Sequence, residues 1–419
     1  MHVMVLGAGI TGVTTAWFLR EAGFKVSVID RQGEAGHETS FANGGQISVS
    51  HPEPWANPSA PLAALSWLGR AGAPLRFVPH ANLDQWQWAF QFLRECLPAR
   101  THRNTVAIAA LALHSLQELH RVREATGIAE AYDARARGIL HLFFDASQLD
   151  RIKARINHLA RLGIETRFCT SDQCIDLEPA LASLRLRLVG GIYAPKDESG
   201  DALRFSQTLA RVLASHDVHF HYQTFIEQFS RADGQITGIE VINDKGGTQI
   251  LSADHYVVCL GSYSRELVRP LGENLPIYPL KGYSVTAAIT DPLRAPSVSL
   301  TDEARRIVCS RLGERLRIAG TAELDDYNRD IDPARINAML AWAEDRLPGA
   351  IDHKRITPWT GLRPATPGGV PLIGRSPYPN LWYNTGHGTL GWTLSCGSAS
   401  SLATLMRGEK PAIAFPFLH

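Results

Sequence analysis

The chain has 419 residues, of which 45% are apolar and 20% charged, and this is the composition of a globular protein of two or three domains. Its formal net charge of +1 argues against a nucleic-acid partner, because such proteins carry a strongly basic surface. The six cysteines are scattered without a C-x-x-C pair, which predicts reduced thiols, a cytoplasmic setting and no metal site.

Neither a leader nor a membrane-spanning helix is expected. Residues 1–23 are apolar enough to resemble a signal peptide, but they lack a basic start and a small-residue cleavage site. No uninterrupted apolar stretch reaches the roughly 18 residues that a spanning helix needs. We therefore expect no part of the chain to cross a membrane.

The N-terminal segment predicts a nucleotide-binding unit. Val3–Leu6 is a short apolar run typical of a buried strand, and residues 13–22 carry apolar side chains at helical spacing. Lys25–Ile29 is a second strand, which ends at Asp30. Gly7-Ala8-Gly9-Ile10-Thr11-Gly12 lies between the first strand and the helix, so the glycine pattern of dinucleotide-binding folds occurs in its expected context.

Each part of this unit has a physical role. Gly7 makes the tight turn, Gly9 lets the backbone approach a pyrophosphate, and Gly12 lets the helix pack closely against the strand. The first turn of the helix offers unpaired N–H groups and a partial positive charge to the phosphates. Asp30 is expected to accept hydrogen bonds from the ribose hydroxyls, and its charge disfavours NADP because it repels a 2′-phosphate.

The segment after Asp30 distinguishes between the two common dinucleotides. Residues 38–46 read Glu-Thr-Ser-Phe-Ala-Asn-Gly-Gly-Gln, where an NAD domain would normally continue with alternating strands and helices. A loop of glycines and small polar residues suits a long flat ligand. The sequence therefore favours FAD.

Residues 55–185 differ in character from the nucleotide unit. Long helices are predicted at residues 105–126 and 146–163, after aromatic and leucine-rich segments. We expect none of these in the nucleotide core and assign them, with residues 265–355, to a substrate domain.

The middle of the chain is predicted to return to the nucleotide sheet. A strand at residues 254–262 runs into a glycine turn, as in flavoprotein folds, and a β-meander precedes it at residues 234–253. Residues 218–222 form another predicted strand, on which His219 and His221 share one face. Either a metal pair or ordinary polar strand residues would account for these histidines.

Two later segments carry candidate substrate contacts. Residues 276–288 form a predicted strand that contains Tyr283. Arg363 stands in an apolar, turn-rich stretch at residues 359–367. It is either a surface arginine or a guanidinium that grips a substrate carboxylate in a bidentate manner.

The C-terminal region repeats the glycine pattern. A short strand at residues 381–384 precedes Gly386-His387-Gly388-Thr389-Leu390-Gly391, and residues 392–406 form a predicted helix. The chain ends too soon after this helix for a second nucleotide fold. The turn is therefore either a plain helix entry or a helix N-terminus beside the flavin ring, where it would stabilise the charge of the reduced flavin.

Together these motifs resemble the D-amino acid dehydrogenase branch of the D-amino acid oxidase and glycine oxidase superfamily. The resemblance covers the chain from end to end and rests on the opening glycine motif, residues 39–43 and 257–263, Leu362-Arg363-Pro364 and Gly386-His387-Gly388. It implies an α/β fold in which an FAD-binding Rossmann-like domain of the glutathione-reductase type is interleaved with an α+β substrate domain carrying an antiparallel sheet. The predicted FAD-binding domain comprises residues 1–54, 186–264 and 356–419, and the substrate-binding domain residues 55–185 and 265–355.

The resemblance also implies an activity. Members of this family bind FAD noncovalently, oxidise D-amino acids to 2-oxo acids and ammonia, and pass electrons to a quinone or another respiratory acceptor, usually at the inner face of the cytoplasmic membrane. In related oxidases the arginine of the Leu-Arg-Pro motif holds the substrate carboxylate, which matches Arg363. We expect hydride transfer from the substrate Cα to flavin N5. The reactive form is the free amine, so no general base is assigned.

The predicted site divides into catalytic and cofactor-binding residues. The catalytic candidates are Arg363, Tyr283 and His387, and for the last two a structural role is an equal alternative. The predicted FAD-binding residues are Gly7, Gly9, Ile10, Thr11, Gly12, Asp30, Arg31, Ser40, Asn43, Gly44, Gly45, Gln46, Gly261, Gly388, Thr389, Leu390, Gly391 and Trp392.

The substrate and the acceptor have alternatives. Gly368 replaces an aspartate that family members often carry, and His51 and Pro52 lie in a variable loop, so D-proline, hydroxyproline or a bulkier D-amino acid are candidate substrates. One rival activity is a glycine- or sarcosine-type oxidase that produces hydrogen peroxide. A rival of another class is a flavin-carrying electron-transfer subunit without a substrate of its own.

The sequence is compatible with contacts to a membrane surface and to other subunits. Four tryptophans lie close together in the sequence, namely Trp55, Trp67, Trp86 and Trp88. Tryptophans suit a peripheral membrane contact, unless these four pack inside the substrate domain. A homo-oligomer and a hetero-oligomer are both compatible with the sequence.

Overall fold

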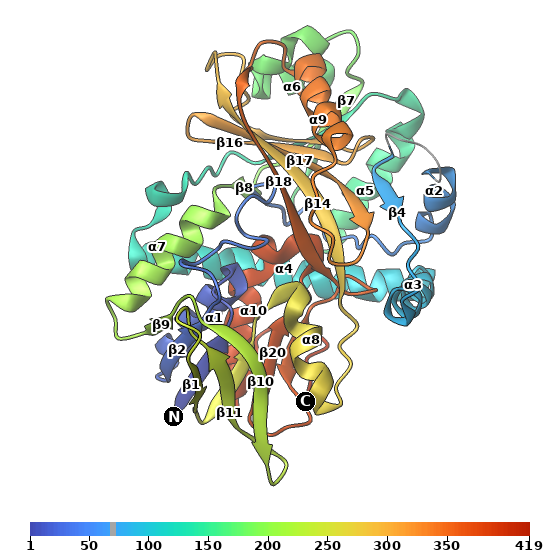
Figure 1. Cartoon of the computed structure of the whole chain (residues 1–419). Helices are drawn as coiled ribbons and strands as arrows, with labels where there is room; N and C mark the ends of the chain where they lie inside the picture. Colours follow the sequence, from blue (N-terminus) through green and yellow to red (C-terminus); the bar gives the residue numbers. More distant parts are fainter. Residues whose placement is uncertain (68–72) are drawn as a thin grey trace.

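The computed structural model describes residues 1–67 and 73–419, apart from the side chains of Leu65 and Trp67. Two large sheets organise these residues and lie at opposite ends of the molecule, with both chain termini at the end of the smaller sheet (Figure 1). The smaller sheet is mostly parallel and the larger one mostly antiparallel. The predicted fold class is therefore confirmed.

The smaller sheet contains the strands that the nucleotide motif predicts. Its strand order is β19-β20-β13-β1-β2-β9, and all neighbours are parallel except β19 and β20. The strands are β1 (His2–Leu6), β2 (Lys25–Ile29), β9 (His219–His221), β13 (His255–Val258), β19 (Leu372–Arg375) and β20 (Leu381–Thr385). Valines of β1 and β2 are buried, as expected of a parallel sheet that is covered on both faces.

Two helices pack against this sheet and two more pack on those helices, and one of the four corrects an expectation. They are α1 (Ile10–Glu21), α4 (Pro98–Thr126), α7 (Ala202–Ala214) and α10 (Gly391–Met406). Ile108 and Leu111 of α4 belong to the same hydrophobic core as Val5 of β1 and Leu394 of α10, so the placement of this helix outside the nucleotide core is wrong. Periodicity shows that a helix has an apolar face, but it does not show what that face contacts. The other domain boundaries stay a prediction.

The larger sheet has the order β18-β14-β17-β16-β15-β5-β7-β6, with β4 beside β17. Its strands are β4 (Leu75–Phe77), β5 (Ile139–Phe143), β6 (Arg167–Thr170), β7 (Gly190–Ala194), β14 (Tyr278–Ile289), β15 (Ser299–Asp302), β16 (Ile307–Leu312), β17 (Arg315–Leu324) and β18 (Ile351–Ala365). Helix α9 (Pro333–Arg346) packs on it and buries Trp342 completely. Helices α5 (Leu149–Arg161) and α6 (Ser171–Leu177) pack against β6.

Strand β18 corrects a second expectation. Residues 359–367, which read as a turn-rich stretch, lie mostly within this strand, and β18 pairs with β14 up to Ala365. The prolines suggested turns, but β18 is the edge strand of the sheet, where Pro358 and Pro364 do not remove a necessary hydrogen bond. Arg363 therefore lies within a strand and is paired with Leu280 of β14.

The remaining strands and α-helices complete the fold. The predicted β-meander is confirmed as β10 (Phe225–Ala232), β11 (Gln235–Ile242) and β12 (Thr248–Leu251), and the others are β3 (Gln46–Ile47), β8 (Glu198–Ser199), α2 (Ala60–Trp67), α3 (Leu83–Glu95) and α8 (Ser264–Val268). None of the helices in residues 1–67 and 73–419 has the length and apolar character needed to span a membrane.

The four tryptophans do not form one surface. Trp88 is buried and donates its indole N–H to the Ala365 carbonyl at 2.8 Å, whereas Trp86 is half exposed. Trp55 is partly buried against the same cluster as Trp88. The side chain of Trp67 lies outside the described residues. Peripheral membrane contact stays a prediction, without Trp88 as a candidate.

Candidate active site

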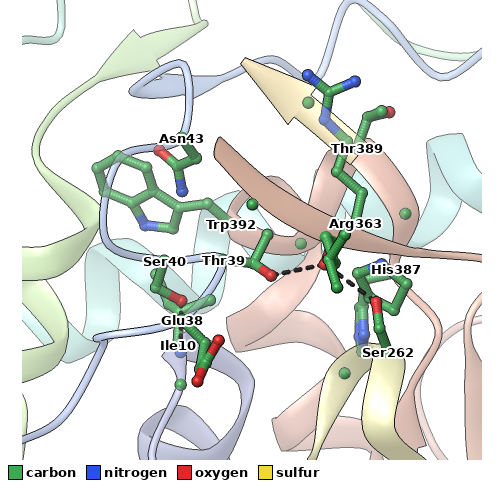
Figure 2. Close-up of a pocket in the computed structure, with 18 of the residues that line it drawn as sticks. Ile10, Glu38, Thr39, Ser40, Asn43, Ser262, Arg363, His387, Thr389 and Trp392 are labelled. Carbon is green, nitrogen blue, oxygen red and sulfur yellow. Dashed lines mark hydrogen bonds between the residues drawn. The ribbon is translucent and has the colours of Figure 1, made fainter. Parts of the chain in front are cut away.

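One cavity of about 480 Å³ runs from the glycine turn after β1 to the inner face of the larger sheet. Of the predicted site residues, all except Gly12 line it, including Arg363, Tyr283 and His387. In Figure 2, Trp392 of α10, Arg363 of β18 and Ser40 all belong to the wall of this cavity. The structure therefore brings together segments from both ends of the chain, and their contacts with FAD stay a prediction.

The glycine turn after β1 is closely packed, and two of its glycines have no room for a Cβ atom. Gly7 has φ +102°, and a Cβ atom there would lie 2.7 Å from the Cys259 carbonyl oxygen. A Cβ at Gly12 would overlap the Gly7 carbonyl, so Gly12 acts in packing and does not line the cavity. The Ser40 hydroxyl accepts a hydrogen bond from the Ile10 amide at 3.0 Å and fixes the following loop to the start of α1.

Asp30 ends β2 and faces the cavity. One of its carboxylate oxygens accepts the Ala8 amide at 2.6 Å and the other accepts the Gln32 amide at 2.8 Å. Burial raises the pKa of Asp30, and these two hydrogen bonds oppose the shift. Each oxygen retains a lone pair, so the carboxylate can still accept a ribose hydroxyl.

Two orphaned polar atoms also indicate a ligand. Among the described residues, Trp392 Nε1 and Thr321 Oγ1 are buried without a hydrogen-bond partner, and both residues line the cavity. Buried polar atoms in proteins are rarely unpaired. With the glycine turn and the helix N-terminus, these donors fit a long polar cofactor such as FAD.

Arg363 places a guanidinium in the cavity wall. Its Nη1 donates to the Thr321 carbonyl at 3.2 Å, and no carboxylate of the described residues forms an ion pair with it. Burial lowers the pKa of Arg363 to about 10, so the guanidinium remains protonated at neutral pH. Gly282 of β14 makes room for it, because a Cβ atom there would overlap the guanidinium.

Two hydroxyl groups hold the backbone next to Arg363. Thr39 and Ser262 donate to the Leu362 carbonyl at 2.7 and 3.0 Å, and these are the dashed lines of Figure 2. The two donors come from the loop after β2 and the turn after β13. Two segments that are predicted to bind FAD thus fix the strand that carries the arginine.

The other two catalytic candidates are engaged with the protein. Tyr283 donates its hydroxyl to Glu323 at 2.8 Å, and burial raises the pKa of Tyr283 to about 12. His387 lies 3.0 Å from the Ser398 hydroxyl, and burial lowers the pKa of His387 to about 3. Ser398 already donates to the Ser395 carbonyl, so the neutral imidazole must donate to Ser398. Neither residue is poised for acid–base chemistry at neutral pH.

One group of site residues has no sequence signal apart from that of His51. Glu303 lines the cavity, and its Oε1 lies 2.8 Å from His141 Nδ1 and 2.7 Å from Arg155 Nη1. With His51, Glu303 and His141 form a cluster whose ligand atoms are close enough to hold a metal ion. Arg155 already donates to Glu303 and to His51 Nδ1, so a guanidinium takes the place that a metal would need. The four residues come from four separate segments and meet only in the fold.

A second cavity of about 870 Å³ adjoins the first. The two share His51, Trp55 and the turn at residues 387–390. Its other lining residues are mostly apolar or aromatic and include Phe77, Trp88, Phe92, Leu280 and Leu324. We call it the apolar cavity.

Comparison with known proteins identifies the family. Residues 2–405 match the family described as FAD dependent oxidoreductase. The chain belongs to this family. It is 48% identical to a D-amino acid dehydrogenase of Dechloromonas aromatica (strain RCB) over 100% of both chains. It is 44% identical to a D-amino acid dehydrogenase of Paramagnetospirillum magneticum (strain ATCC 700264 / AMB-1), over 99% of this chain and 97% of the relative.

A solved structure shows the same fold. The glycine oxidase of Bacillus cereus ATCC 14579 superposes with a TM-score of 0.70 at 23% identity, over 97% of this chain and 95% of that one. The resemblance inferred from the motifs is confirmed by the relatives. The protein is an FAD-dependent oxidoreductase, as the family match shows.

Proposed function

We propose that this oxidoreductase is a dehydrogenase that converts D-amino acids to 2-oxo acids and ammonia and passes the electrons to a quinone or another acceptor that is not oxygen. The observation that carries the proposal is the guanidinium of Arg363, which lies partly buried in the cavity wall without an ion-pair partner among the described residues. A buried cation without a carboxylate partner is costly unless a ligand supplies one. An amino acid supplies a carboxylate beside the carbon that is oxidised.

The side chains of the cavity position the substrate. Arg363 grips the carboxylate, and the Thr39 and Ser262 hydroxyls keep its backbone in place. Gly391 begins α10 at the cavity, where the helix N-terminus favours negative charge. The chemistry that FAD supplies when bound is the acceptance of a hydride from the substrate Cα.

The apolar cavity supports a preference among D-amino acids. It adjoins the cavity of Arg363 and is lined by aromatic and aliphatic side chains, so it suits a large apolar substrate side chain. Burial of apolar surface contributes about 25 cal/mol per Å². We expect D-phenylalanine and D-leucine to have a higher kcat/KM than D-aspartate.

Anaerobic bleaching of the flavin tests the proposal. The holoenzyme is mixed without oxygen with D-amino acids, their L-enantiomers and the corresponding amines that lack a carboxylate. We expect D-amino acids alone to bleach the flavin rapidly. If none of the D-amino acids reduces the flavin, the proposed function is wrong.

The electron acceptor is tested separately. Turnover with a reactive D-amino acid is measured under air and then with a soluble quinone or a dye. The dehydrogenase assignment predicts that the artificial acceptor raises turnover strongly. Rapid stoichiometric hydrogen peroxide, with no gain from the acceptor, would instead indicate an oxidase of the glycine or sarcosine type.

A further inference from the structure

A series of buried side chains leads from the cavity wall into the protein. Glu303 lines the cavity, and its Oε1 lies 2.8 Å from His141 Nδ1. His141 Nε2 lies 3.0 Å from the Ser50 hydroxyl, which in turn lies 2.6 Å from Asp197 Oδ2. Ser50, His141 and Asp197 are each 1% exposed. The series is therefore continuous and shielded from bulk water.

The hydrogen bonds of this series require a definite number of protons. Three hydrogen bonds join the four groups, and each needs one proton. The Ser50 hydroxyl supplies one proton and a neutral His141 supplies a second. With both carboxylates ionised, one of the three links is left without a proton. A single added proton completes the series, whether it rests on Asp197 or on His141.

The surroundings place this proton on Asp197. Burial raises the pKa of Asp197 to about 7, although hydrogen bonds from Ser50 and the Val49 amide oppose the shift. Burial lowers the pKa of His141, so the imidazole remains neutral. Burial also acts to raise the pKa of Glu303, but the charge of Arg155 and the hydrogen bond to His141 outweigh it and hold that pKa well below its usual range.

The other charged groups near the series leave Glu303 accessible to a ligand. Arg155 of α5 donates to Oε1, while among the described residues Oε2 has only Arg306 Nη1 as a partner, at 3.5 Å. His51 lies 3.9 Å from Oε1. At the other end, the carboxylate of Glu198, which follows Asp197, is held by Arg123 and His120. Glu303 thus presents one largely free carboxylate oxygen at the cavity wall.

We propose that Glu303, His141, Ser50 and Asp197 form a proton relay that takes the proton which the substrate ammonium group must lose before Cα is oxidised. This proposal rests on the proposed function, because it requires an amino acid in the cavity. An ammonium N–H bond breaks, and its electron pair stays on nitrogen as the lone pair of the free amine. Before the transfer the vacant link lies between Glu303 and His141 Nδ1, so the neutral imidazole carries its proton on Nε2 and donates it to Ser50. The Glu303 carboxyl takes the ammonium proton and gives it to His141 Nδ1, the Nε2 proton passes to the Ser50 oxygen, and the Ser50 proton passes to Asp197, where the O–H bond forms.

The relay carries a proton and no electrons. The two electrons of the Cα–H bond leave with its hydrogen as a hydride to FAD, which is the oxidant of the proposed function. Glu303 is ionised before and after the transfer, because Arg155 remains beside it. The relay accepts a proton only while Asp197 is ionised, so the rate of flavin reduction should rise with pH through about 7.

Asp197→Asn tests the relay because the amide N–H permanently supplies the one hydrogen that the series lacks when both carboxylates are ionised. Its N–H donates to Ser50, which leaves no place for another proton. Anaerobic stopped-flow measurement of flavin reduction by a D-amino acid should then lose the inflection near neutral pH, with a rate at pH 7 that is lower by about a hundredfold. Asp201→Asn is the matched control, since Asp201 is an equally buried aspartate that caps α7 and does not line the cavity.

A second measurement does not depend on activity. Infrared difference spectra of the substrate-free holoenzyme should contain the carbonyl stretch of a protonated carboxyl group, which disappears as the pH rises through about 7. This band should be absent in Asp197→Asn and present in Asp201→Asn. If Asp197→Asn does not fold, Ser50→Ala serves instead: the band should remain while the kinetic inflection is lost.

The outcomes separate the two proposals. An inflection that survives in Asp197→Asn or Ser50→Ala, or a wild-type enzyme without the band, overturns the relay even when D-amino acids reduce the flavin. If no D-amino acid reduces the flavin, the proposed function fails and the relay to a substrate ammonium fails with it, while the infrared band still shows whether Asp197 stores a proton.

Discussion

The two ends of the cavity are built in different ways. The nucleotide end comes from one continuous stretch, in which glycines 7 and 9 and the first turn of α1 present backbone atoms and Asp30 presents its carboxylate. The substrate end is made of side chains on β14, β17 and β18, together with the loop after β2 and the turn after β13. The position of Arg363 depends on its neighbours. Thr39 and Ser262 hold the carbonyl of the preceding residue, and Gly282 leaves space for the guanidinium.

This difference shows how each end responds to substitution. A site made of backbone amides tolerates side-chain changes, provided that the turn keeps its shape. A site made of one charged side chain depends on that side chain and on the space around it. Substitutions at the two ends should therefore separate cofactor binding from substrate turnover.

The largest effect is expected from Arg363→Lys. The charge is kept, but a point charge cannot reproduce the bidentate fork, and a poorly paired buried carboxylate costs about 2–5 kcal/mol. We expect kcat/KM for a D-amino acid to fall by roughly tens to thousands of fold, with FAD retained. Steady-state kinetics and the flavin content after dialysis measure the two effects. Near-normal kinetics would remove Arg363 from the substrate site.

Gly282→Ala should give the next largest effect, at the same end. Its Cβ would overlap the Arg363 guanidinium, whose flexible end can move aside while the fold persists. A displacement of about 1 Å can cost around a hundredfold in kcat/KM. Thermal unfolding and FAD binding should change little. Gly33→Ala is the control, because a Cβ there meets no atom within 4 Å.

Asp30→Ala should act at the nucleotide end. Loss of a charge-assisted hydrogen bond costs about 1.5–3 kcal/mol, so the Kd of FAD should rise by about ten- to a hundredfold. The apoprotein should still fold, and kcat with saturating FAD should stay near the wild-type value. Titration of the apoprotein with FAD gives the Kd. A variant that retains flavin through dialysis as tightly as wild type contradicts the ribose contact.

The smallest effect is expected from His387→Asn. Burial lowers the pKa of His387 to about 3, so this residue does not change its charge between pH 5 and 9. The pH dependence of kcat/KM should therefore have the same inflections in the variant as in wild type. A profile from pH 5 to 9 for both proteins tests this. An inflection that disappears with the imidazole would assign acid–base chemistry to His387.

The nucleotide end could be predicted from the sequence because its information is local. The turn, the helix and the strand follow each other at fixed spacing, and every part has a steric reason that can be read from residue type. The sequence of residues 39–46 predicts a loop but does not predict which residues the loop contacts. The donation from Thr39 to Leu362 joins residues at opposite ends of the chain and has no pattern in the sequence.

The substrate end could be predicted only in part. The sequence indicates Arg363 as a single charge in an apolar stretch and, through the resemblance, as the arginine of the Leu-Arg-Pro motif. It does not predict the strand that carries Arg363, because prolines indicate turns except at a sheet edge. Glu303, His141 and Ser50 lie on separate strands and loops, and each alone is an ordinary polar residue. Strand register and packing across the sheet bring these residues together, and their spacing in the sequence does not predict that contact. Helix α4 was misplaced for the same reason.

The order of the core strands has a consequence for synthesis on the ribosome. Strand β1 pairs with β13, β13 pairs with β20, and α1 packs on α10, so the first and last elements of the chain share one core. The N-terminal unit emerges first but cannot bury its apolar surface until α10 has left the ribosome, and long-range contacts of this kind form slowly. Until then β13 has an open edge where β20 will pair, and such edges promote aggregation. We therefore expect nascent chains that stop before residue 381 to be insoluble and to need chaperones throughout their synthesis.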